Sequence, residues 1–318
     1  SVDNTLPVVT TSTLSVAENQ TVVGQLAVTD ANTVSYALGS GGDAALFNLS
    51  STGALTFKSA KNYEVDAKSY SISVIPTDAA GNVGAAKTVA VSVTDVNEAP
   101  TVVTGSPSSY TVVVNQALSN ANVAGWFSDA DAGTNGTLTY SVKSTTPLPT
   151  GLTLNPTTGA VTGTVTATGS ASVTFVATDG GALSVEKTVT LNAVTAPAVQ
   201  GFTVVDGTAP TAVGKQGEAL TFTVALSEAV TVAGTPVIGF SAGTGSPFNA
   251  SYVSGSGTNS LTFSGIAPVG DGTLKLVSIA LNGGTVTGNA SGQALVTTAV
   301  NQTFGGYSVD NTLPVVTT

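Results

Sequence analysis

The sequence predicts an all-β protein made of tandem β-sandwiches, and three observations support this. Hydrophobic residues make up 42% of the chain, and Val, Leu, Ile and Phe alternate with Thr and Ser. Such period-two alternation is typical of half-buried strands. Gly (36) and Pro (13) are spread throughout, and no segment shows the 3.6-residue period of a helix. The clearest predicted strands are Thr21–Val28, Leu55–Lys58, Tyr70–Ile75 and Thr88–Val93.

The residue types that are missing exclude several kinds of chemistry. The 318 residues contain no Cys, no His and no Met, so zinc and copper sites lack their usual ligands. Catalytic Ser-His-Asp and Cys-His groups cannot form. Carboxylates such as Glu64 and Asp66 could imitate a glycosidase pair, but nothing in the sequence indicates a substrate cleft. We therefore expect no enzymatic activity.

The charge of the chain limits its partners. The net charge is −10 and only 8% of the residues are charged, whereas binding to nucleic acid requires clustered basic residues. No apolar run reaches the roughly 18 residues that a membrane span needs. We therefore expect no nucleic-acid partner and no membrane insertion in this segment.

An exact repeat organises the chain. The string SVDNTLPVVTT occupies residues 1–11 and recurs at residues 308–318, a spacing of 307 residues. This repeat predicts a parent protein in which the whole unit recurs in tandem, so that the partners of one unit are neighbouring repeats of the same chain.

Two proline-containing stretches divide the unit further. Asn97–Pro100 and the region Ala196–Val205 both follow strand-like runs that end in Val. They predict domains at residues 1–98, 99–197 and 198–307, with residues 308–318 beginning the next repeat. Each of the three is about 100 residues long, which is a common domain size.

The first predicted domain resembles bacterial cadherin-like repeats. The resemblance rests on Ala17-Glu18-Asn19, Asn62-Tyr63-Glu64 and Asp95-Val96-Asn97-Glu98-Ala99-Pro100. It implies a Greek-key β-sandwich with calcium ions at the joint between successive domains. The family usually carries Asp-x-Asn-Asp-Asn-Ala-Pro at that joint, so the shorter motif here leaves the number of ions open.

The second predicted domain resembles the dystroglycan-type cadherin or immunoglobulin-like repeats of bacterial surface proteins. The most recognisable string is Leu148-Pro149-Thr150-Gly151-Leu152-Thr153-Leu154-Asn155, followed by Thr158-Gly159-Ala160-Val161-Thr162-Gly163-Thr164. Trp126 and Phe127 precede an Asp-x-Asp turn, and we expect both of them in the core.

Together these motifs predict a calcium site between the first two domains. Calcium takes six to eight oxygen ligands, and carboxylates gathered at one domain end repel one another unless a cation lies among them. The alternative is that these are ordinary turn acids. The expected ligands are Glu18, Glu64, Asp66, Asp95, Asn97, Glu98, Asp129, Asp131 and Asp179.

The third predicted domain resembles the immunoglobulin-like repeats of biofilm-associated proteins, through Leu220–Val224, Ser227–Val230 and Ala250–Thr258. Its end and the start of the first domain are expected to form calcium half-sites that meet between repeats, made of Asp3, Asn4, Asp30, Asp78, Glu218, Glu228, Asp310 and Asn311. Residues 192–199 contain no acid, so we expect fewer ions between the second and third domains, or none.

These resemblances imply a function that is mechanical. The chain is identified as an extender repeat of a giant bacterial adhesin of the RTX or biofilm-associated type, which implies a secreted monomer displayed at the cell surface. Calcium would stiffen the joints so that a distal binding region is held away from the cell for adhesion and biofilm formation. The alternative is a calcium-dependent module that binds a glycan or a protein, but aromatic residues make up only 6% of the chain.

Overall fold

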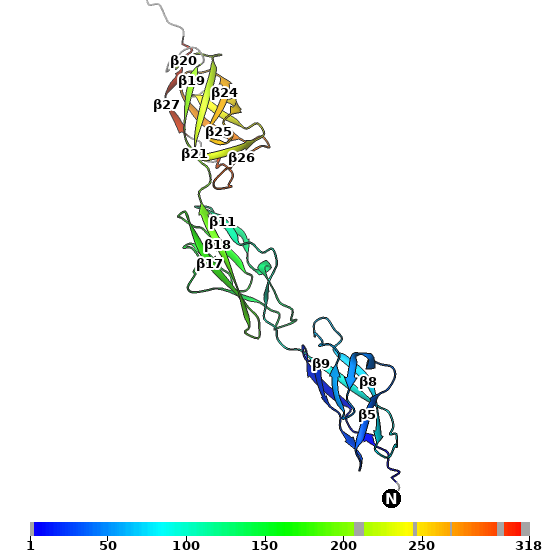
Figure 1. Cartoon of the computed structure of the whole chain (residues 1–318). Helices are drawn as coiled ribbons and strands as arrows, with labels where there is room; N and C mark the ends of the chain where they lie inside the picture. The colour runs from blue at the N-terminus through cyan, green and yellow to red at the C-terminus, as the bar shows by residue number, and fades with distance from the viewer. Residues whose placement is uncertain (1–2, 207–212, 244–246, 268, 298–301, 313–318) are drawn as a thin grey trace, which may run out of the picture.

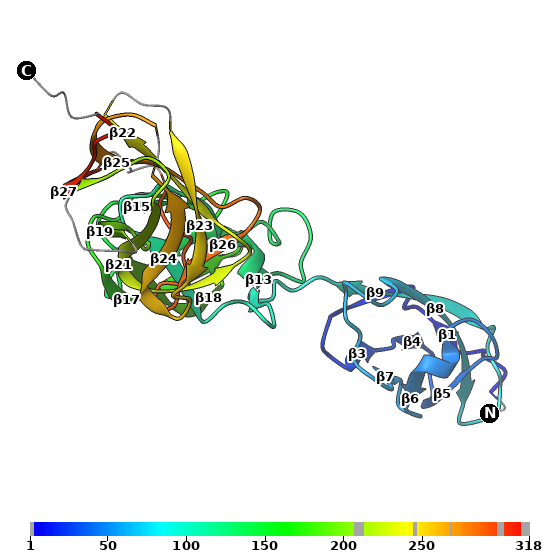
Figure 2. The ribbon, with the colours of Figure 1, turned by 90° about the horizontal axis from the view of Figure 1, so that it is seen from above.

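Strands joined by turns and irregular loops make up almost all of the described structure. The computed structural model describes residues 3–206, 213–243, 247–267, 269–297 and 302–312. Two single 3-10 turns, Ala44–Leu46 and Ala124–Trp126, are the only helical elements among these residues. Figure 1 shows three strand-built bodies that follow one another along the chain, and Figure 2 shows the first body extending away from the other two. The all-β, tandem-sandwich prediction is confirmed.

The first body packs a four-stranded sheet against a three-stranded one. The four-stranded sheet has the order β2-β9-β8-β5, and the smaller sheet has the order β3-β7-β6. A short pair, β1-β4, closes one end. The strands are β1 (Val8–Val9), β2 (Thr13–Ala17), β3 (Val22–Gln25), β4 (Val28–Thr29), β5 (Val34–Leu38), β6 (Phe47–Leu49), β7 (Ala54–Phe57), β8 (Ser69–Asp78) and β9 (Lys87–Thr94).

The second body repeats this plan. Its sheets have the orders β11-β18-β17-β14 and β12-β16-β15, with the short pair β10-β13. The strands are β10 (Thr101–Val102), β11 (Ser109–Val113), β12 (Leu118–Asn122), β13 (Phe127–Ser128), β14 (Thr139–Val142), β15 (Leu152–Leu154), β16 (Ala160–Gly163), β17 (Gly169–Thr178) and β18 (Ser184–Val194).

The strands of the third body form one continuous hydrogen-bonded sheet with the order β19-β21-β24-β23-β22-β25-β27-β20. Strand β26 lies off this order and pairs with β21. The long strand β21 breaks register between Ala225 and Val230, which lets its two halves serve different partners. The strands are β19 (Val199–Asp206), β20 (Val213–Gly214), β21 (Ala219–Ala233), β22 (Val237–Ala242), β23 (Phe248–Ser254), β24 (Thr258–Ile266), β25 (Gly272–Ala280), β26 (Thr285–Gly288) and β27 (Gln302–Val309).

One direction of pairing recurs in all three bodies. Near the start of each body, a strand pairs in parallel with the body's last strand: β2 with β9, β11 with β18 and β20 with β27. The remaining ladders are antiparallel wherever the structure describes them. The chain therefore enters each of the first two bodies at one end and leaves at the opposite end.

Each body encloses its own hydrophobic core. The inward residues of the alternating strands supply it, for example Ile72 and Val74 of β8, which are 1% and 0% exposed. In the second body, Trp126 packs edge-on against Phe175, with ring centroids 5.4 Å apart. Trp126 and Phe127 are buried, as expected. Among the residues described, no helix is long and apolar enough to cross a membrane.

The only tryptophan of the chain permits a test of whether the cores are independent. Replacing Phe175 with Ala removes the ring packed against Trp126 and leaves a cavity, so the second body should lose about 3–5 kcal/mol of unfolding free energy. Denaturant titration followed by Trp126 fluorescence measures this loss. The matched control is Phe222→Ala in the third core, which should leave the Trp126 midpoint unchanged. An equal shift in both variants would show that the bodies unfold together.

Candidate metal centre between the first two bodies

Parallel pairing gathers the first acids at the joint between the first and second bodies. In the β2·β9 ladder, Ala17 is opposite Thr94. The next residue on each strand, Glu18 and Asp95, therefore emerges at the same edge of the sheet. The loop before β8 adds Glu64, and the segment after β9 adds Asn97 and Glu98. The second body contributes Asp129 and Asp131, which follow β13, and Asp179, which follows β17.

Two overlapping groups of carboxylates result. Ligand oxygens of Glu18, Glu64 and Asp95 lie within 4.8 Å of one another, and so do those of Glu64, Glu98 and Asp131. Glu64 belongs to both groups, and Asp131 comes from the second body. Each group offers carboxylate oxygens to a common centre, and the second group draws them from both bodies.

Backbone hydrogen bonds hold these carboxylates in place. The amides of Tyr63 and Val96 donate to the two oxygens of Glu18, at 2.8 and 2.9 Å, and Glu18 is only 2% exposed. Across the joint, the Glu98 amide donates to Asp131 Oδ2 at 2.9 Å. Because one oxygen of Asp131 is held in this way, its other oxygen has a fixed direction.

A side-chain contact orients the linker amide. Asn97 Nδ2 donates to Asp179 Oδ2 at 2.9 Å, and Asp179 Oδ1 accepts from the Leu183 amide at 2.8 Å. A Cβ atom on Gly181 would lie 2.6 Å from the Asn97 amide, so glycine is required for this approach. The Nδ2 atom of Asn97 is thereby committed to Asp179, and Asn97 Oδ1 is left buried without a hydrogen-bond partner.

The observation that points to a ligand is a set of oxygens with no partner. Among the described residues, five buried side-chain oxygens at this joint accept no hydrogen bond. Leaving a buried polar atom unsatisfied costs about 1–3 kcal/mol, and more for a charged group. A hard cation such as calcium, which takes six to eight oxygen ligands, would satisfy them together. The oxygens are Glu64 Oε2, Asn97 Oδ1, Glu98 Oε2, Asp129 Oδ2 and Asp131 Oδ1.

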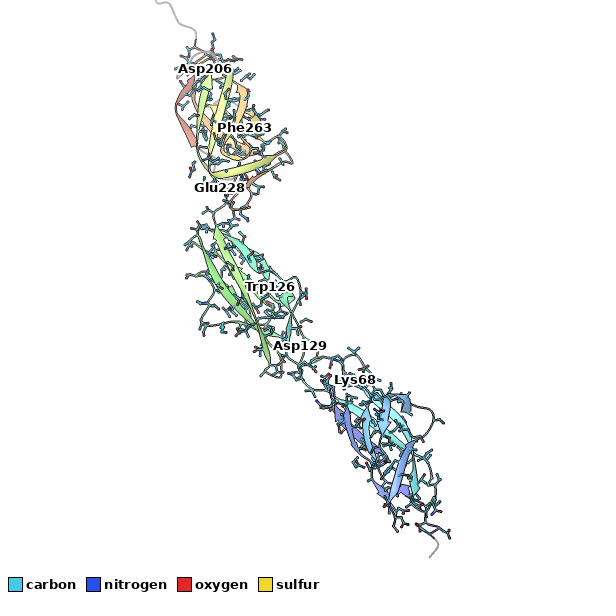
Figure 3. The ribbon with its side chains drawn as sticks, viewed as in Figure 1. Lys68, Trp126, Asp129, Asp206, Glu228 and Phe263 are labelled. Atoms are coloured by element: carbon cyan, nitrogen blue, oxygen red, sulfur yellow. The ribbon has the colours of Figure 1, made fainter. Side chains whose placement is uncertain are left out.

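The shifted pKa values of the carboxyls at this joint show that the site favours positive charge. Desolvation, followed by repulsion from the neighbouring carboxylates, raises the pKa values of Glu64, Asp95 and Glu98. Lys68 opposes this effect at Asp95, but its Nζ lies over the Tyr63 ring, 3.9 Å from the centroid. Figure 3 labels Lys68 and Asp129 on the two sides of the joint.

Asp66 does not join these groups. Its side chain is exposed, and Oδ2 accepts from the Asn62 amide at 2.9 Å within its own loop. It belongs to neither carboxylate group. Asn19, which was not among the expected ligands, instead donates from Nδ2 to Glu98 Oε1 at 3.1 Å.

A third acidic group lies at the other end of the first body. Oxygens of Asp3, Asp30 and Asp78 lie within 4.8 Å of one another. These three residues were expected to belong to the first body's half of a calcium site between repeats. Burial opposes the charge on Asp78, but hydrogen bonds from Asn82, Ala80 and Gly81 lower its pKa overall. Asn4 is exposed beside this group.

At the far end of the third body, Asp310 and Asn311 lie close to Gly214 and Gln216. Glu218 is at the same end, where Oε2 accepts from the Lys215 amide at 3.0 Å. Asp271, which sequence reasoning missed, accepts from the Asn311 amide at 2.6 Å. Its only sequence signal is the turn Gly270-Asp271-Gly272. Residues 313–318 of the second SVDNTLPVVTT string lie outside the described residues.

Glu228 requires a correction. It was grouped with Asp310, but it lies at the opposite end of the third body, next to the second body (Figure 3). There it lines a pocket with Val194 and Thr195, and Oε2 accepts from the amides of Ala290 and Ser291 at 3.0 Å. Glu228 therefore holds the loop after β26 and cannot meet Asp310.

The joint between the second and third bodies is built without such a group. The Ala198 amide donates to Ser227 Oγ at 3.0 Å, and the Ser227 amide donates back to the Ala198 carbonyl at 2.9 Å. The Val296 amide also donates to the Pro197 carbonyl at 3.0 Å. Within the described ranges, no group of three or more acids gathers there.

Residues 99–194 match the family model described as "Putative Ig domain". No curated protein matches the chain. The structure is similar to human protocadherin-24 EC1-2, at 18% identity, 60% coverage of this chain, 100% of that one and a TM-score of 0.49. Mouse cadherin-23 EC22-24 gives 15% identity, 96% and 99% coverage and a TM-score of 0.46.

The cadherin domains 3-6 of protocadherin gamma B2 are 21% identical, with 60% of this chain covered and a TM-score of 0.46. The similarity spans about half, 53%, of the length of that protein's structure. At these identities the likeness concerns fold alone.

The raised pKa values predict a pH dependence in the absence of divalent cations. A raised folded-state pKa means that the stability from these carboxyls is full below the unfolded value, about 4, and is lost as the pH rises through the raised values. In EDTA, the melting temperature of the joint should therefore be higher at about pH 5 than at about pH 7. Calorimetry at the two pH values measures this difference.

The comparison of the two pH values needs reference variants, because Asp78 and Glu228 have lowered pKa values. The stability that these two carboxyls contribute is lost, and not gained, as the pH falls. Glu64→Gln should reduce the gain at acid pH. Glu186→Gln should not, since Glu186 is an exposed partner of Lys143, 2.8 Å away. Identical pH profiles for Glu64→Gln and the unmodified chain would contradict the electrostatic account.

Proposed function

We propose that the chain is a calcium-rigidified structural spacer, an extender repeat of a repetitive bacterial cell-surface adhesin. The observation that carries this proposal is the set of five buried, unpartnered oxygens that converge from two bodies on one joint. Oxygens left in this state destabilise the joint when it is empty and stabilise it when a cation binds. A joint that depends on a cation changes from loose to stiff as the cation arrives.

The ligands divide between two positions. Glu18, Glu64 and Asp95 would hold one ion within reach of the first body. Glu64, Glu98 and Asp131 would hold a second ion between the bodies, assisted by the oxygens of Asn97 and Asp129. Asp179 acts by orienting Asn97, while Asp66 stays outside the ion positions.

Calcium suits this donor set better than other metals. All donors are oxygens, the chain has neither Cys nor His, and carboxylate or carbonyl donors favour calcium and magnesium over softer ions. Magnesium demands near-ideal octahedral geometry and releases its water reluctantly, which a wide site with several carboxylates does not provide. Extracellular calcium modules commonly bind in the range of about 10⁻⁴–10⁻³ M, so the joints would stiffen after export.

The repeated string supports an array outside the cell. Tandem copies every 307 residues would give a long, secreted, monomeric fibre with three folding units per period, at residues 1–98, 99–197 and 198–307. The fibre would hold a distal region away from the cell surface and would perform no catalysis. Between periods, Asp310 and Asn311 would be the Asp3 and Asn4 of the next unit, and they would lie between Glu218 of one unit and Asp30 and Asp78 of the next.

Calcium should raise the melting temperature of the chain. At about 10 mM calcium, a site with Kd of about 10⁻⁴–10⁻³ M stabilises its domain by about 1.4–2.7 kcal/mol. For a domain of this size, that corresponds to a shift of about 10 °C. Scanning calorimetry in EDTA, in calcium and in magnesium measures it. Coincident melts in EDTA and calcium would overturn the proposal.

Substitutions of neighbouring acids should separate ligands from bystanders. Glu64→Gln and Asp131→Asn each remove one charge from the second carboxylate group and should abolish most of the calcium shift. The matched control is Asp66→Asn, in the same loop as Glu64. This variant should retain the full calcium shift, because Asp66 is exposed and accepts a hydrogen bond from the Asn62 backbone amide within its own loop. An equal loss in the Asp66 variant would show that the response comes from net charge alone.

A further inference from the structure

The segment Ser-Val-Asp-Asn-Thr occurs in two different surroundings within one chain. Asp3, Asn4 and Thr5 correspond to Asp310, Asn311 and Thr312. Both copies form the same local turn: the Thr5 amide donates to Asp3 Oδ1 at 2.9 Å, and the Thr312 amide donates to Asp310 Oδ1 at 2.8 Å. The Asp-Asn-Thr part therefore forms the same turn in both copies, which differ in what surrounds them.

The carboxy-terminal copy is held by its asparagine. The Asn311 amide donates to Asp271 Oδ1 at 2.6 Å, and Nδ2 donates to the Gly270 carbonyl at 3.0 Å. Asn311 Oδ1 accepts from the Gln216 amide at 2.6 Å, and Thr312 Oγ1 donates to Asp271 Oδ2 at 3.1 Å. The aspartate of this copy, Asp310, is exposed.

The amino-terminal copy is held by its aspartate. Asp3 Oδ2 accepts from Asn32 Nδ2, and the Asp3 carbonyl accepts from Asn82 Nδ2 at 3.1 Å. Asp3 is half-buried near Asp30 and Asp78, whereas Asn4 is exposed. At the other end of the chain the asparagine makes the contacts and the aspartate side chain is exposed.

The two sets of contacts use different atoms. The third body binds through the asparagine amide and side chain and the threonine hydroxyl, while the first body binds through the aspartate Oδ2 and carbonyl. Only the local turn bond is common to both. A single copy of the segment can therefore make both sets of hydrogen bonds at once.

We infer that Ser-Val-Asp-Asn-Thr is a two-sided adaptor that docks the third body of one copy of this chain onto the first body of the next. Gln216 and Asp271 form the docking surface on the preceding copy, and Asn32 and Asn82 form it on the following copy. The inference rests on the tandem arrangement proposed above, but it does not require calcium at the joint between the first two bodies.

The linker between consecutive copies is short, so the contacts of this adaptor should determine how the third body of one copy is oriented relative to the first body of the next. β27 ends at Val309, and β1 begins at Val8, which corresponds to the sixth residue after Val309 in a continuous array. A linker this short spans at most about 3.3–3.6 Å per residue, and contacts on both sides remove most of its remaining freedom. The relative orientation of consecutive copies should therefore be fixed by these hydrogen bonds.

The test uses a chain of two consecutive copies that share one adaptor. Because the protein has no cysteine, Lys275→Cys in the first copy and Lys87→Cys in the second provide two unique, exposed positions for spin labels. Pulsed electron spin resonance then gives the distribution of distances across the junction. The unmodified junction should give one narrow peak.

Asn311→Ala in the shared adaptor should broaden that peak, and so should Asp271→Ala in the first copy, which removes the acceptors of the Asn311 amide and the Thr312 hydroxyl. The matched control is Asn4→Ala at the amino terminus of the first copy, where the same residue faces solvent, and it should leave the peak unchanged. An unchanged peak in the junction variants, or equal broadening in the control, would overturn the inference.

A second measurement separates this inference from the calcium proposal. In the single 318-residue chain in EDTA, the amides of Asn311 and Gln216 should be protected from hydrogen exchange, because their partners belong to the protein. Asn311→Ala should abolish the protection at Gln216. Rapid exchange at both amides in the unmodified chain would overturn the adaptor, whatever calcium does at the other joint.

Discussion

Repulsion among carboxylates that the fold itself forces together governs the joint between the first two bodies. The parallel ladder of β2 and β9 sets Glu18 beside Asp95, and the short linker brings Glu98 against Asp131. Neither contact can relax without breaking a strand pair or a backbone hydrogen bond. Lys68 supplies little compensation because its ammonium group lies over Tyr63. The carboxylates of this joint are therefore left largely uncompensated by the side chains that the structure describes around them.

The two internal joints consequently differ in what holds them. Between the second and third bodies, backbone groups of Pro197 and Ala198 bond directly to Val296 and Ser227. Neutral hydrogen bonds of this kind are largely insensitive to salt, whereas interactions between charges are screened by it. One joint therefore contains clustered charges, and the other is held by neutral hydrogen bonds. The alternation follows from the acid-free stretch at residues 192–199.

Much of this arrangement was predictable from sequence. Alternation identified β7, β8 and β9, because side chains in a strand must point to opposite faces. The acids at Glu18, Glu64, Asp95 and Asp131 come together as expected from their motifs. Glu228 was misplaced because a motif does not show at which end of a long strand it will lie. Asp66 and Asp271 illustrate the remaining difficulty: whether a turn acid caps its own loop or meets a distant segment depends on packing between loops.

The parallel pairing of entry and exit strands determines how the chain responds to tension. Force applied between the two ends of the chain pulls β2 against β9, and β11 against β18, in opposite directions along their length. All the hydrogen bonds of a ladder are then loaded together in shear, instead of being opened one after another as in a peeled hairpin. Rupture must break the five-residue ladder Ser109–Val113 as a unit. The same strand directions that place the acids at the joint thus oppose separation of the first and last strands in each of the first two sandwiches.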